Sequence, residues 1–565
     1  MIKIKNLGFG IAAWGMALTM GCSEQAEIAS TPEKSNNLYE GVEFNMPQVA
    51  EPSFPDNAVS IVDFGAKGDG AFDNTDAFKK AIDDVAQKGG GKVVVPRGIW
   101  LTGPIVLKSN INLEVQDGAL ITFSKNFDQY PLIATSFEGL ETYRCISPIY
   151  GKDLENIAIT GNGVIDGSGD AWRPVKKSKL TSSHWKKLVK SGGVVNEKGS
   201  IWYPSEKSLR GHSSGNFNVP DLTSLQQHEA VKDFLRPVMV SLINCKKVLL
   251  DGSTFQNSPA WNLHPLMCED VTIRNLTIRN PWYSQNGDGL DLESCKNVVI
   301  HDNSFDVGDD AICFKSGKDE DGLKRGVPTE NVIVKNNIVY HGHGGFTVGS
   351  EMSGGVKNVH VSNCTFIGTD CGLRFKSTRG RGGVVENIFI SKIDMINIGA
   401  EAIRFNLYYG GESPIGDDGS VGKEMEGREK VEVSRTTPSF RDIYITDVNS
   451  TGSGVAAFFQ GLPEMKLKNI QLKNVFLEGK KGVTLIDAND ISFENVQIAQ
   501  SSGPALTVFN TNKLDISNLA VRPSEDKTIN VYGTETDAIT FKDSKISQAS
   551  VFIAEEVKES SVVFD

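Results

Sequence analysis

The sequence predicts an all-β protein that folds as a right-handed, single-stranded parallel β-helix with a capping helix at its N-terminal end. Three observations predict this fold: an internal repeat, a strand-type alternation inside each repeat, and little helical periodicity outside one segment. The repeat opens with Asn or Asp, and it starts at Asn156, Asp270, Asn297, Asn331, Asn358, Asn387, Asp442 and Asn469. From Asp270 the starts lie about 27 to 34 residues apart with one doubled gap, a period typical of solenoids.

Each repeat reads as a short strand, because apolar and mostly β-branched residues alternate with other residues. A single turn cannot bury its apolar face alone, so successive turns stack about 4.8 Å apart and share one core. The chain lacks both the helices of alternating strand–helix units and the regular Leu spacing of leucine-rich repeats. We expect the Asn and Asp residues that open the repeats to be structural, bonding backbone in turns and stacking into ladders.

One helix is expected before the repeats. Asn74 and Thr75 are candidate N-caps, residues 78–85 place apolar side chains on one face, and Gly89 to Gly91 end the pattern. Such a helix would cover the open end of the β-helix, where strand edges are otherwise unpaired.

The N-terminus carries a predicted targeting segment. A positively charged start and an apolar run over residues 7–20, too short to span a membrane, are followed by Gly21 and Cys22. Gly before Cys resembles a bacterial lipoprotein cleavage box, which makes residues 1–22 the signal peptide and Cys22 the lipidated residue. An ordinary cleaved signal peptide is the alternative. Both imply export, as a periplasmic or outer-membrane lipoprotein or as a secreted protein, and residues 23–55 read as a flexible linker.

Residues 56–565 are predicted to form one catalytic β-helix domain, with insertions at about 172–236 and 408–437 where the repeat breaks. The net charge of −12 argues against nucleic acid or an anionic membrane surface as a partner, so membrane contact is expected only through the lipid anchor. No Cys or His spacing suggests zinc. We expect no metal, no organic cofactor and a monomer, and leave open whether Cys364 and Cys371 form a disulfide.

Carboxylates spaced by one turn of the solenoid supply the candidate chemistry. Hydrolysis of a glycosidic bond needs one carboxylic acid to protonate the leaving oxygen and a second carboxylate to activate water or to attack. Asp288 lies about one turn before the pair Asp309 and Asp310. His343 follows one coil later, and the next coil brings Arg374 and Lys376, whose i, i+2 spacing points both cations to one side of a strand.

In order along the chain, these positions resemble the four signatures of family-28 glycoside hydrolases, the polygalacturonases. The matching segments are Asn286-Gly287-Asp288, Gly308-Asp309-Asp310, Gly342-His343-Gly344 and Arg374-Phe375-Lys376. The first departs from the family pattern at Gly287, where the family has Thr. Residues 62–70 and 93–98 also resemble the opening of pectin-lyase-like β-helix proteins, and the resemblance extends from about residue 58 to 460.

The resemblance implies a role for each matching residue. Asp309 would be the general acid, with His343 holding its protonation and geometry. Asp288 and Asp310 would share activation of water, which gives inversion and requires carboxyl groups roughly 6.5–9.5 Å apart. Like-charge repulsion would keep the acid protonated. Arg374 and Lys376 would bind the galacturonate carboxylate, and Asn286 and Tyr408, or its neighbour Tyr409, would contact the sugar.

The function predicted from this resemblance is hydrolysis of α-1,4-linked galacturonic acid in pectin or oligogalacturonides. Together with residues 172–236, the insertion at 315–324 would close one end of the groove and favour exo action. The alternatives are a rhamnogalacturonan or xylogalacturonan hydrolase, a Ca²⁺-dependent pectate lyase, and a non-catalytic carbohydrate-binding β-helix.

Overall fold

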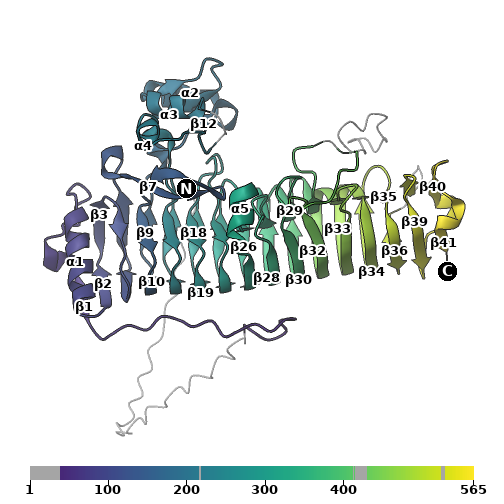
Figure 1. Ribbon diagram of the computed structural model, residues 1–565, viewed down its shortest axis with the longest axis horizontal. Coiled ribbons are helices and arrows are strands. Elements are labelled where there is room, and N and C mark those ends of the chain that lie inside the picture. Colours follow the sequence, from purple (N-terminus) through teal and green to yellow (C-terminus); the bar gives the residue numbers. More distant parts are fainter. Residues whose placement is uncertain (1–37, 215–217, 412, 414–428, 523–527, 565) are drawn as a thin grey trace, which may run out of the picture. The chain divides into compact units, whose positions relative to one another are not determined.

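The computed structural model describes residues 38–214, 218–411, 413, 429–522 and 528–564. Residues 41–565 form one unit, whose main sheet joins 36 strands, paired in parallel from coil to coil, into a right-handed β-helix (Figure 1). The predicted fold class is therefore confirmed. Among the residues that the structure describes, none of the helices has the length and apolar character needed to span a bilayer.

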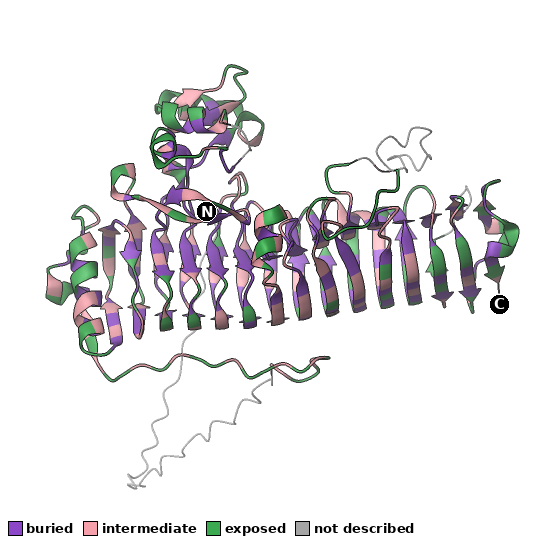
Figure 2. Cartoon of the chain, in the orientation of Figure 1, coloured by how far each residue is buried: buried purple, intermediate pink, exposed green. Residues whose placement is uncertain are grey.

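The predicted repeats form one of the strand stacks that run along the solenoid. Successive members are β19 (Glu269–Arg274), β22 (Lys296–His301), β25 (Thr329–Lys335), β28 (Val356–Ile367) and β30 (Val384–Ile396). Their apolar positions share one register, in which Val271 pairs with Val298, Val298 with Val332 and Val332 with Val359. These side chains are almost fully buried, so the alternation seen in the sequence marks the interior of the solenoid (Figure 2).

The Asn and Asp residues that open the repeats form a ladder along this stack. Asp270, Asn297, Asn331 and Asn358 have φ between 55° and 57°, in the left-handed region that Asn tolerates better than most residues. The Asn358 amide donates to Asn331 Oδ1 at 3.0 Å, and the Asn331 amide donates to Asn297 Oδ1 at 3.1 Å. One coil, β16 (Lys246–Asp251), places Lys247 at this position with φ 53°, which explains why its repeat signature is absent.

The active-site stack runs beside the repeat stack. It contains β18 (Leu263–Leu266), β21 (Leu290–Glu293), β24 (Ile312–Lys315), β27 (Gly344–Val348) and β29 (Cys371–Lys376), paired in that order. The seven cysteines in the described residues are all buried and free. Cys364 and Cys371 therefore form no disulfide here.

The capping helix is α1 (Thr75–Gln87), and Phe78, Ala81, Ile82 and Val85 on its inner face are buried. Its N-terminus differs from the expectation. The Asn74 side chain makes no cap bond; its Oδ1 accepts from the Lys67 N–H at 2.8 Å. Instead Asp73 Oδ1 accepts from the Thr75 N–H at 3.0 Å. Asn74 thus ties the preceding loop to the helix.

Residues 41–55, named the strap, lie extended along the outer side of the repeat stack (Figure 1). Glu43 Oε2 lies 2.7 Å from His360 Nδ1, the Phe44 and Phe389 ring centroids are 6.3 Å apart, and Glu51 pairs with Arg274. The sequence assigned residues 23–55 to a flexible linker. The strap is instead packed on the β-helix, and residues 23–37, like the signal segment and Cys22, lie outside the described residues.

The insertion at about 172–236 projects from the active-site side (Figure 1). It contains α2 (Ser182–Lys190), α3 (Glu206–His212), α4 (Leu225–Glu229) and a small sheet of β12 (Val175–Lys176), β13 (Val194–Val195) and β14 (Ile201–Tyr203). A hairpin that was not predicted, β7 (Leu132–Phe137) and β8 (Leu140–Cys145), lies against α5 (Asp319–Arg325). The Glu141 N–H donates to Asp321 Oδ2 at 3.1 Å. Most of the second predicted insertion, 408–437, lies outside the described residues.

Candidate active site

The solenoid brings the matching segments of four consecutive coils to one cavity of about 560 Å³. Asp288 precedes β21, Asp309 and Asp310 precede β24, His343 precedes β27, and Arg374 and Lys376 lie in β29. All six side chains line this cavity. Because the coils stack in register, residues that are distant in sequence lie on one face of the active-site stack.

Glycines permit the close backbone packing that turns adjacent aspartates toward the cavity. Asp309 and Asp310 lie in a bend between β23 (Ser304–Asp306) and β24, so strand alternation does not apply to them. A Cβ at Gly308 would come within 2.3 Å of Ser284 Oγ, and one at Gly287 within 1.9 Å of the same atom. Ser284 Oγ donates to the Pro281 carbonyl at 2.6 Å. The Ser284 hydroxyl thus fills the space beside Gly287, the position that departs from the signature.

The three aspartates form a tight cluster. Oxygen atoms of Asp288, Asp309 and Asp310 all lie within 4.8 Å of one another. Each of the three carboxyls therefore has an oxygen close enough to the other two to bind the same water. The side chain of Asp309 is 22% exposed and that of Asp310 is 3% exposed, so Asp309 is the more accessible of the two.

Both cations of the fourth segment bond to Asp310. Arg374 Nη1 lies 3.0 Å from Asp310 Oδ1, and Lys376 Nζ lies 2.8 Å from Asp310 Oδ2. The sequence interpretation assigned these cations to the substrate carboxylate alone. In the structure they also neutralise a buried carboxylate, and they keep further donors because a guanidinium has five N–H groups and an ammonium has three.

His343 bridges two carboxylates. Its Nδ1 lies 3.1 Å from Asp309 Oδ1, and its Nε2 lies 3.6 Å from Asp370 Oδ2. The hydrogen bond to Asp309 raises the pKa of His343 although burial opposes this. Asp370 was not found from the sequence, because it lies between the third and fourth segments and belongs to no signature.

Burial opposes ionisation of all three aspartates, yet their pKa values move apart. Burial and the charges of Asp291 and Asp309 raise the pKa of Asp288 well above its ordinary value. For Asp310 the charges of Lys376 and Arg374 outweigh burial and hold the pKa far below the usual range. The hydrogen bond from His343 likewise lowers the pKa of Asp309. The pKa of Asp309 therefore shifts downward, opposite to the direction expected from like-charge repulsion, and Asp288 is the carboxyl whose pKa is raised.

The two remaining sugar-contact candidates have different surroundings from those expected. Asn286 lines the cavity, but its Oδ1 accepts from Arg236 Nη2 at 3.0 Å, so it is tied to the end of the insertion. Tyr409 lines the cavity with its side chain near Lys376, whereas Tyr408 packs against the hydrophobic core. Tyr409, the alternative left open by the sequence, is therefore the one of the two that lines the cavity.

The cavity wall contains residues that no signature marks. Glu138 comes from the β7–β8 hairpin, Lys318 precedes α5, and Lys176 and Lys179 come from the insertion. Trp282 is 58% exposed and also lines the cavity. Because these residues belong to insertions, periodicity did not point to them.

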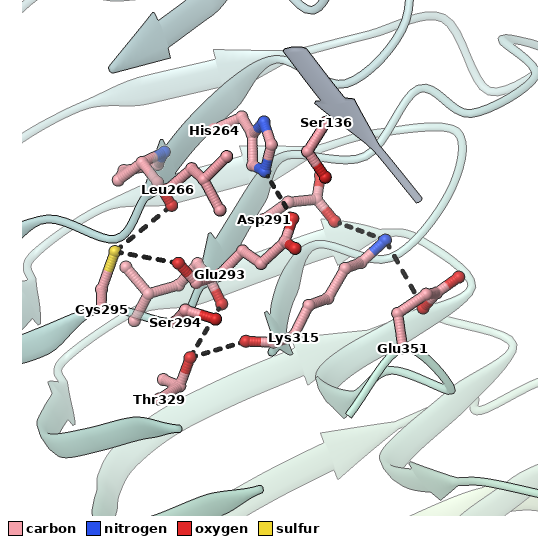
Figure 3. A network of polar contacts seen from close by, with 12 residues as sticks. Ser136, His264, Leu266, Asp291, Glu293, Ser294, Cys295, Lys315, Thr329 and Glu351 are labelled. Carbon is pink, nitrogen blue, oxygen red and sulfur yellow. Dashed lines mark hydrogen bonds and ion pairs between the residues drawn. The ribbon is translucent and has the colours of Figure 1, made fainter. Parts of the chain in front are cut away.

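Beside the three clustered aspartates lies a second charged group, the buried network, made up of His264, Asp291, Glu293, Lys315, Arg325 and Glu351. Figure 3 shows its centre, where Lys315 Nζ lies 3.0 Å from Asp291 Oδ1 and His264 Nε2 lies 2.9 Å from Glu293 Oε2. The Lys315 ammonium also lies 3.7 Å from the Trp261 ring centroid. Lys315 and Glu351 border the cavity, so this network forms part of its wall.

The arrangement supplies the groups that acid–base cleavage of a glycosidic bond requires. Asp309 presents an accessible carboxyl, His343 holds a proton beside it, and the other two carboxyls lie close enough to hold one water between them. The described residues that line the cavity include seven Lys or Arg side chains and five Asp or Glu side chains. The cavity therefore favours an anionic ligand even though the whole chain is acidic.

Comparison with known proteins agrees with this geometry. Sequence models match for "Glycosyl hydrolases family 28" over residues 223–479 and for "Rhamnogalacturonase A/epimerase, pectate lyase-like" over residues 58–188. The chain is 27% identical to an exo-poly-alpha-D-galacturonosidase of Dickeya chrysanthemi, across 80% of this chain and 73% of that protein. It is also 27% identical to a probable polygalacturonase of Vitis vinifera, across 74% of each.

Two solved structures are also similar to this chain. The crystal structure of a hyperthermoactive exopolygalacturonase from Thermotoga maritima is 34% identical, with a TM-score of 0.63, and the match covers 84% of this chain and 94% of that one. A family 28 exopolygalacturonase of Yersinia enterocolitica shares the fold at 23% identity, with a TM-score of 0.59 over 87% of this chain and 79% of that one.

Proposed function

Since the chain belongs to glycosyl hydrolases family 28, we propose that it hydrolyses the α-1,4 linkages of galacturonan and acts from a chain end. The observation that carries this proposal is the cluster of Asp288, Asp309 and Asp310, with oxygens within 4.8 Å of one another, in a cavity that also contains Arg374 and Lys376. Acid–base hydrolysis needs the carboxyls, and a uronic acid substrate needs the cations.

Exo action is supported by the walls at one end of the cavity. The β7–β8 hairpin reaches α5, where the Lys318 N–H donates to the Gly139 carbonyl at 3.2 Å. Glu138 and Asn218 form a hydrogen bond at the cavity wall. Chain segments from three insertions thus meet at the cavity wall on the side of the lower-numbered coils, which supports entry of a polymer by its end.

The proposed mechanism assigns the proton donor to Asp309. As the bond between the anomeric carbon and the glycosidic oxygen breaks, Asp309 gives its proton to that oxygen, and His343, 3.1 Å from Asp309, holds the orientation of its carboxyl. A water held by Asp288 and Asp310 attacks the anomeric carbon and gives its proton to this pair. Before this step, the proton that Asp288 holds through its raised pKa passes to Asp309, whose own pKa is lowered, so that Asp309 acts as the acid and Asp288 as part of the base. The three carboxyls therefore titrate as one coupled group rather than singly.

The close spacing of the carboxyls makes the stereochemical outcome a sharp test. We expect inversion, with the water bound between two side chains of the cluster rather than in a wide gap. Proton NMR of the first products from an oligogalacturonide measures the anomer released. An initial product that keeps the configuration of the substrate would require a covalent intermediate and would contradict this water position.

Product analysis on polygalacturonate tests the reaction itself. We expect saturated mono- or short oligogalacturonates, reducing ends that accumulate before viscosity falls, and activity that chelator leaves unchanged. Unsaturated products together with chelator sensitivity would identify a calcium-dependent lyase. Rapid loss of viscosity would identify internal cleavage.

Rhamnogalacturonan and xylogalacturonan are the alternative substrates. The insertions are the parts of the chain that would contact the sugar side chains of these polymers. Parallel assays on the three polymers rank them. Homogalacturonan is preferred here because Lys376 and Arg374 both lie beside the carboxylate of Asp310, at the reacting centre. If only side-chain-bearing polymers are cleaved, this preference is wrong. If none is cleaved, the non-catalytic carbohydrate-binding alternative is favoured.

We further propose that the β-helix domain, residues 41–565 with the strap included, is monomeric, is exported and is held by a lipid on Cys22. Support comes from the apolar run that ends at Gly21 and Cys22. Mass spectrometry of the mature protein should find the lipid on Cys22, and Cys22→Ser should release soluble enzyme. Cleavage elsewhere without a lipid would indicate an ordinary signal peptide.

A further inference from the structure

The outward rows of the active-site stack continue beyond the catalytic coils. Arg374 pairs in register with Arg404, Arg404 with Phe458, and Phe458 with Thr484. In the neighbouring row Lys376 pairs with Asn406. These residues lie in β29 and in β31 (Glu401–Asn406), β32 (Ser439–Gln460) and β33 (Leu467–Ile486), which follow one another along the solenoid in Figure 1. The face that carries the active site therefore extends toward the C-terminal coils.

On this extension lies a second cavity of about 400 Å³, named the distal groove. Its lining includes two cations, one aromatic ring, two amides and a hydroxyl, from Arg404, Lys481, Phe458, Asn406, Gln460 and Thr484. Coils repeat about every 4.8 Å, which is close to the length of one pyranose unit in a linear chain. The groove thus offers successive positions for successive sugar units.

The charge of the groove suits a polyanion. The side chain of Arg404 is 29% exposed, and Nη1 lies 3.3 Å from Glu401, the acidic residue in this lining. Within the described part of the chain, the bonds of Arg404 use Nη1 alone, which leaves Nη2 and Nε for a ligand. The Arg404 guanidinium also lies 5.8 Å from the Phe458 ring centroid. Among the described residues of the lining, two cations accompany one acidic side chain, and this local excess on a chain of net charge −12 indicates an anionic ligand.

Gln460 gives an independent indication of a ligand. It lines the groove, its side chain is buried at 2% exposure, and Nε2 has no hydrogen-bond partner among the described residues. A buried amide donor without a partner is unfavourable in a folded protein. A hydroxyl or carboxylate oxygen of a bound sugar would supply the missing acceptor.

We propose that the distal groove binds the remainder of the galacturonan chain beyond the released unit, with Arg404 and Lys481 contacting its carboxylates. This inference rests on the proposed function, because the closed end of the catalytic cavity lies toward the lower-numbered coils. A chain whose end occupies that cavity must leave toward β31, β32 and β33. The groove therefore increases affinity for long chains and leaves the chemistry of the reacting unit unchanged.

The test compares short and long substrates in a charge-neutralised variant. We expect Arg404→Gln with Lys481→Gln to lower kcat/KM for hexagalacturonate by roughly tenfold, through KM. For the shortest oligomer that the parent hydrolyses, kcat/KM should change by less than about twofold, since such a substrate does not reach the groove. Added salt should weaken the parent's preference for the hexamer, because screening acts on exposed charges.

A matched control removes the same charge elsewhere. The control variant carries Arg441→Gln and Lys473→Gln. These residues lie on β32 and β33 but outside the groove, where they pair with Glu386 and Glu494. This variant should leave both substrates unaffected. Equal activity of the groove variant and the parent on hexagalacturonate would overturn the proposed role of the distal groove and leave the proposed function standing. Failure of the parent to hydrolyse any galacturonate oligomer would overturn the proposed function and this inference with it.

Discussion

Two charged groups lie side by side on the active-site stack, and they differ in how their carboxylates are paired. In the buried network, Glu293 is bonded to both His264 and Arg325. In the catalytic cluster, both cations bond to Asp310, and Asp288 keeps a buried oxygen without a partner among the described residues. Asp288 and Glu293 are 3% and 0% exposed, so burial alone does not distinguish them.

The consequence is opposite protonation at nearly equal burial. Burial opposes ionisation of Glu293, but the hydrogen bond and charge of His264 and the charge of Arg325 lower its pKa to about 2. For Asp288 the uncompensated burial raises the pKa well above the usual range. Pairing with cations therefore decides which of these two buried carboxyls has a lowered pKa and which has a raised pKa.

The largest effect is expected at the accessible carboxyl of the catalytic cluster. Asp309→Asn removes the proton donor and should lower kcat on polygalacturonate by about a thousandfold or more, since general acid catalysis contributes roughly 10²–10⁴. Reducing-end assays measure the rate, and thermal unfolding should show a folded protein. Asp370→Asn is the control, because it touches only the far nitrogen of His343. Activity of Asp309→Asn near that of the parent would assign the acid to another residue.

Breaking the buried network should chiefly reduce stability. Glu293→Gln leaves Arg325 and His264 without a charged partner, and we expect the free energy of unfolding to fall by about 3 kcal/mol at neutral pH. The pKa of Glu293 is about 2 when folded, below its ordinary value of 4.5. Its stabilisation is thus fully present above about pH 4.5 and is lost as pH falls through 2.

Denaturant unfolding at several pH values checks this difference. The gap between the parent and Glu293→Gln should narrow as the pH falls from 4.5 toward 2. Glu386→Gln, which removes one of two carboxylate partners of the more exposed Arg441, serves as the control and should change stability much less. A gap that does not depend on pH would mean that lost packing, rather than lost charge, explains the effect.

For Asp288 we expect the opposite effect on the free energy of unfolding: removing this carboxyl should stabilise the protein at neutral pH. A carboxyl whose folded pKa is raised above its unfolded value of 3.8 destabilises the protein progressively as pH rises from that value toward the folded pKa. Asp288→Asn should therefore abolish activity yet raise the free energy of unfolding at pH 7 by on the order of 1 kcal/mol or more. Below pH 3.8 the parent and the variant should be nearly equal. Destabilisation at pH 7 would show that Asp288 has a cation partner in solution.

The repeats were predictable from the sequence because a local pattern specifies each strand. Asn at a left-handed position and two alternating apolar residues recur in coil after coil, and stacking follows from them. β16 was missed because Lys247 occupies the Asn position. The strap was missed because its partners Arg274 and His360 lie in distant coils, so nothing within the strap itself marks its packing.

The order of the four signatures in the sequence predicted that these segments share one face of the solenoid. It did not predict which of their side chains contact one another. Whether the cations bond to Asp310 or to Asp288 depends on side-chain geometry across three coils. The spacing of these residues in the sequence does not specify that geometry. The choice between Tyr408 and Tyr409 depends on where β31 ends. The buried network depends on the hairpin and α5, which lie outside the repeat.

The smallest effect on stability is expected where water screens an ion pair on the side of the solenoid away from the active-site stack. Glu51 of the strap pairs with Arg274, and their side chains are 44% and 25% exposed. Arg274 also bonds to Asp251 through Nε at 2.8 Å, so Glu51→Gln leaves a charged partner in place. We expect unfolding free energy to fall by less than about 1 kcal/mol, and by less still in high salt. A loss as large as that of Glu293→Gln would mean that exposure does not weaken pairing here, and that the strap anchors the coils as firmly as the buried network does.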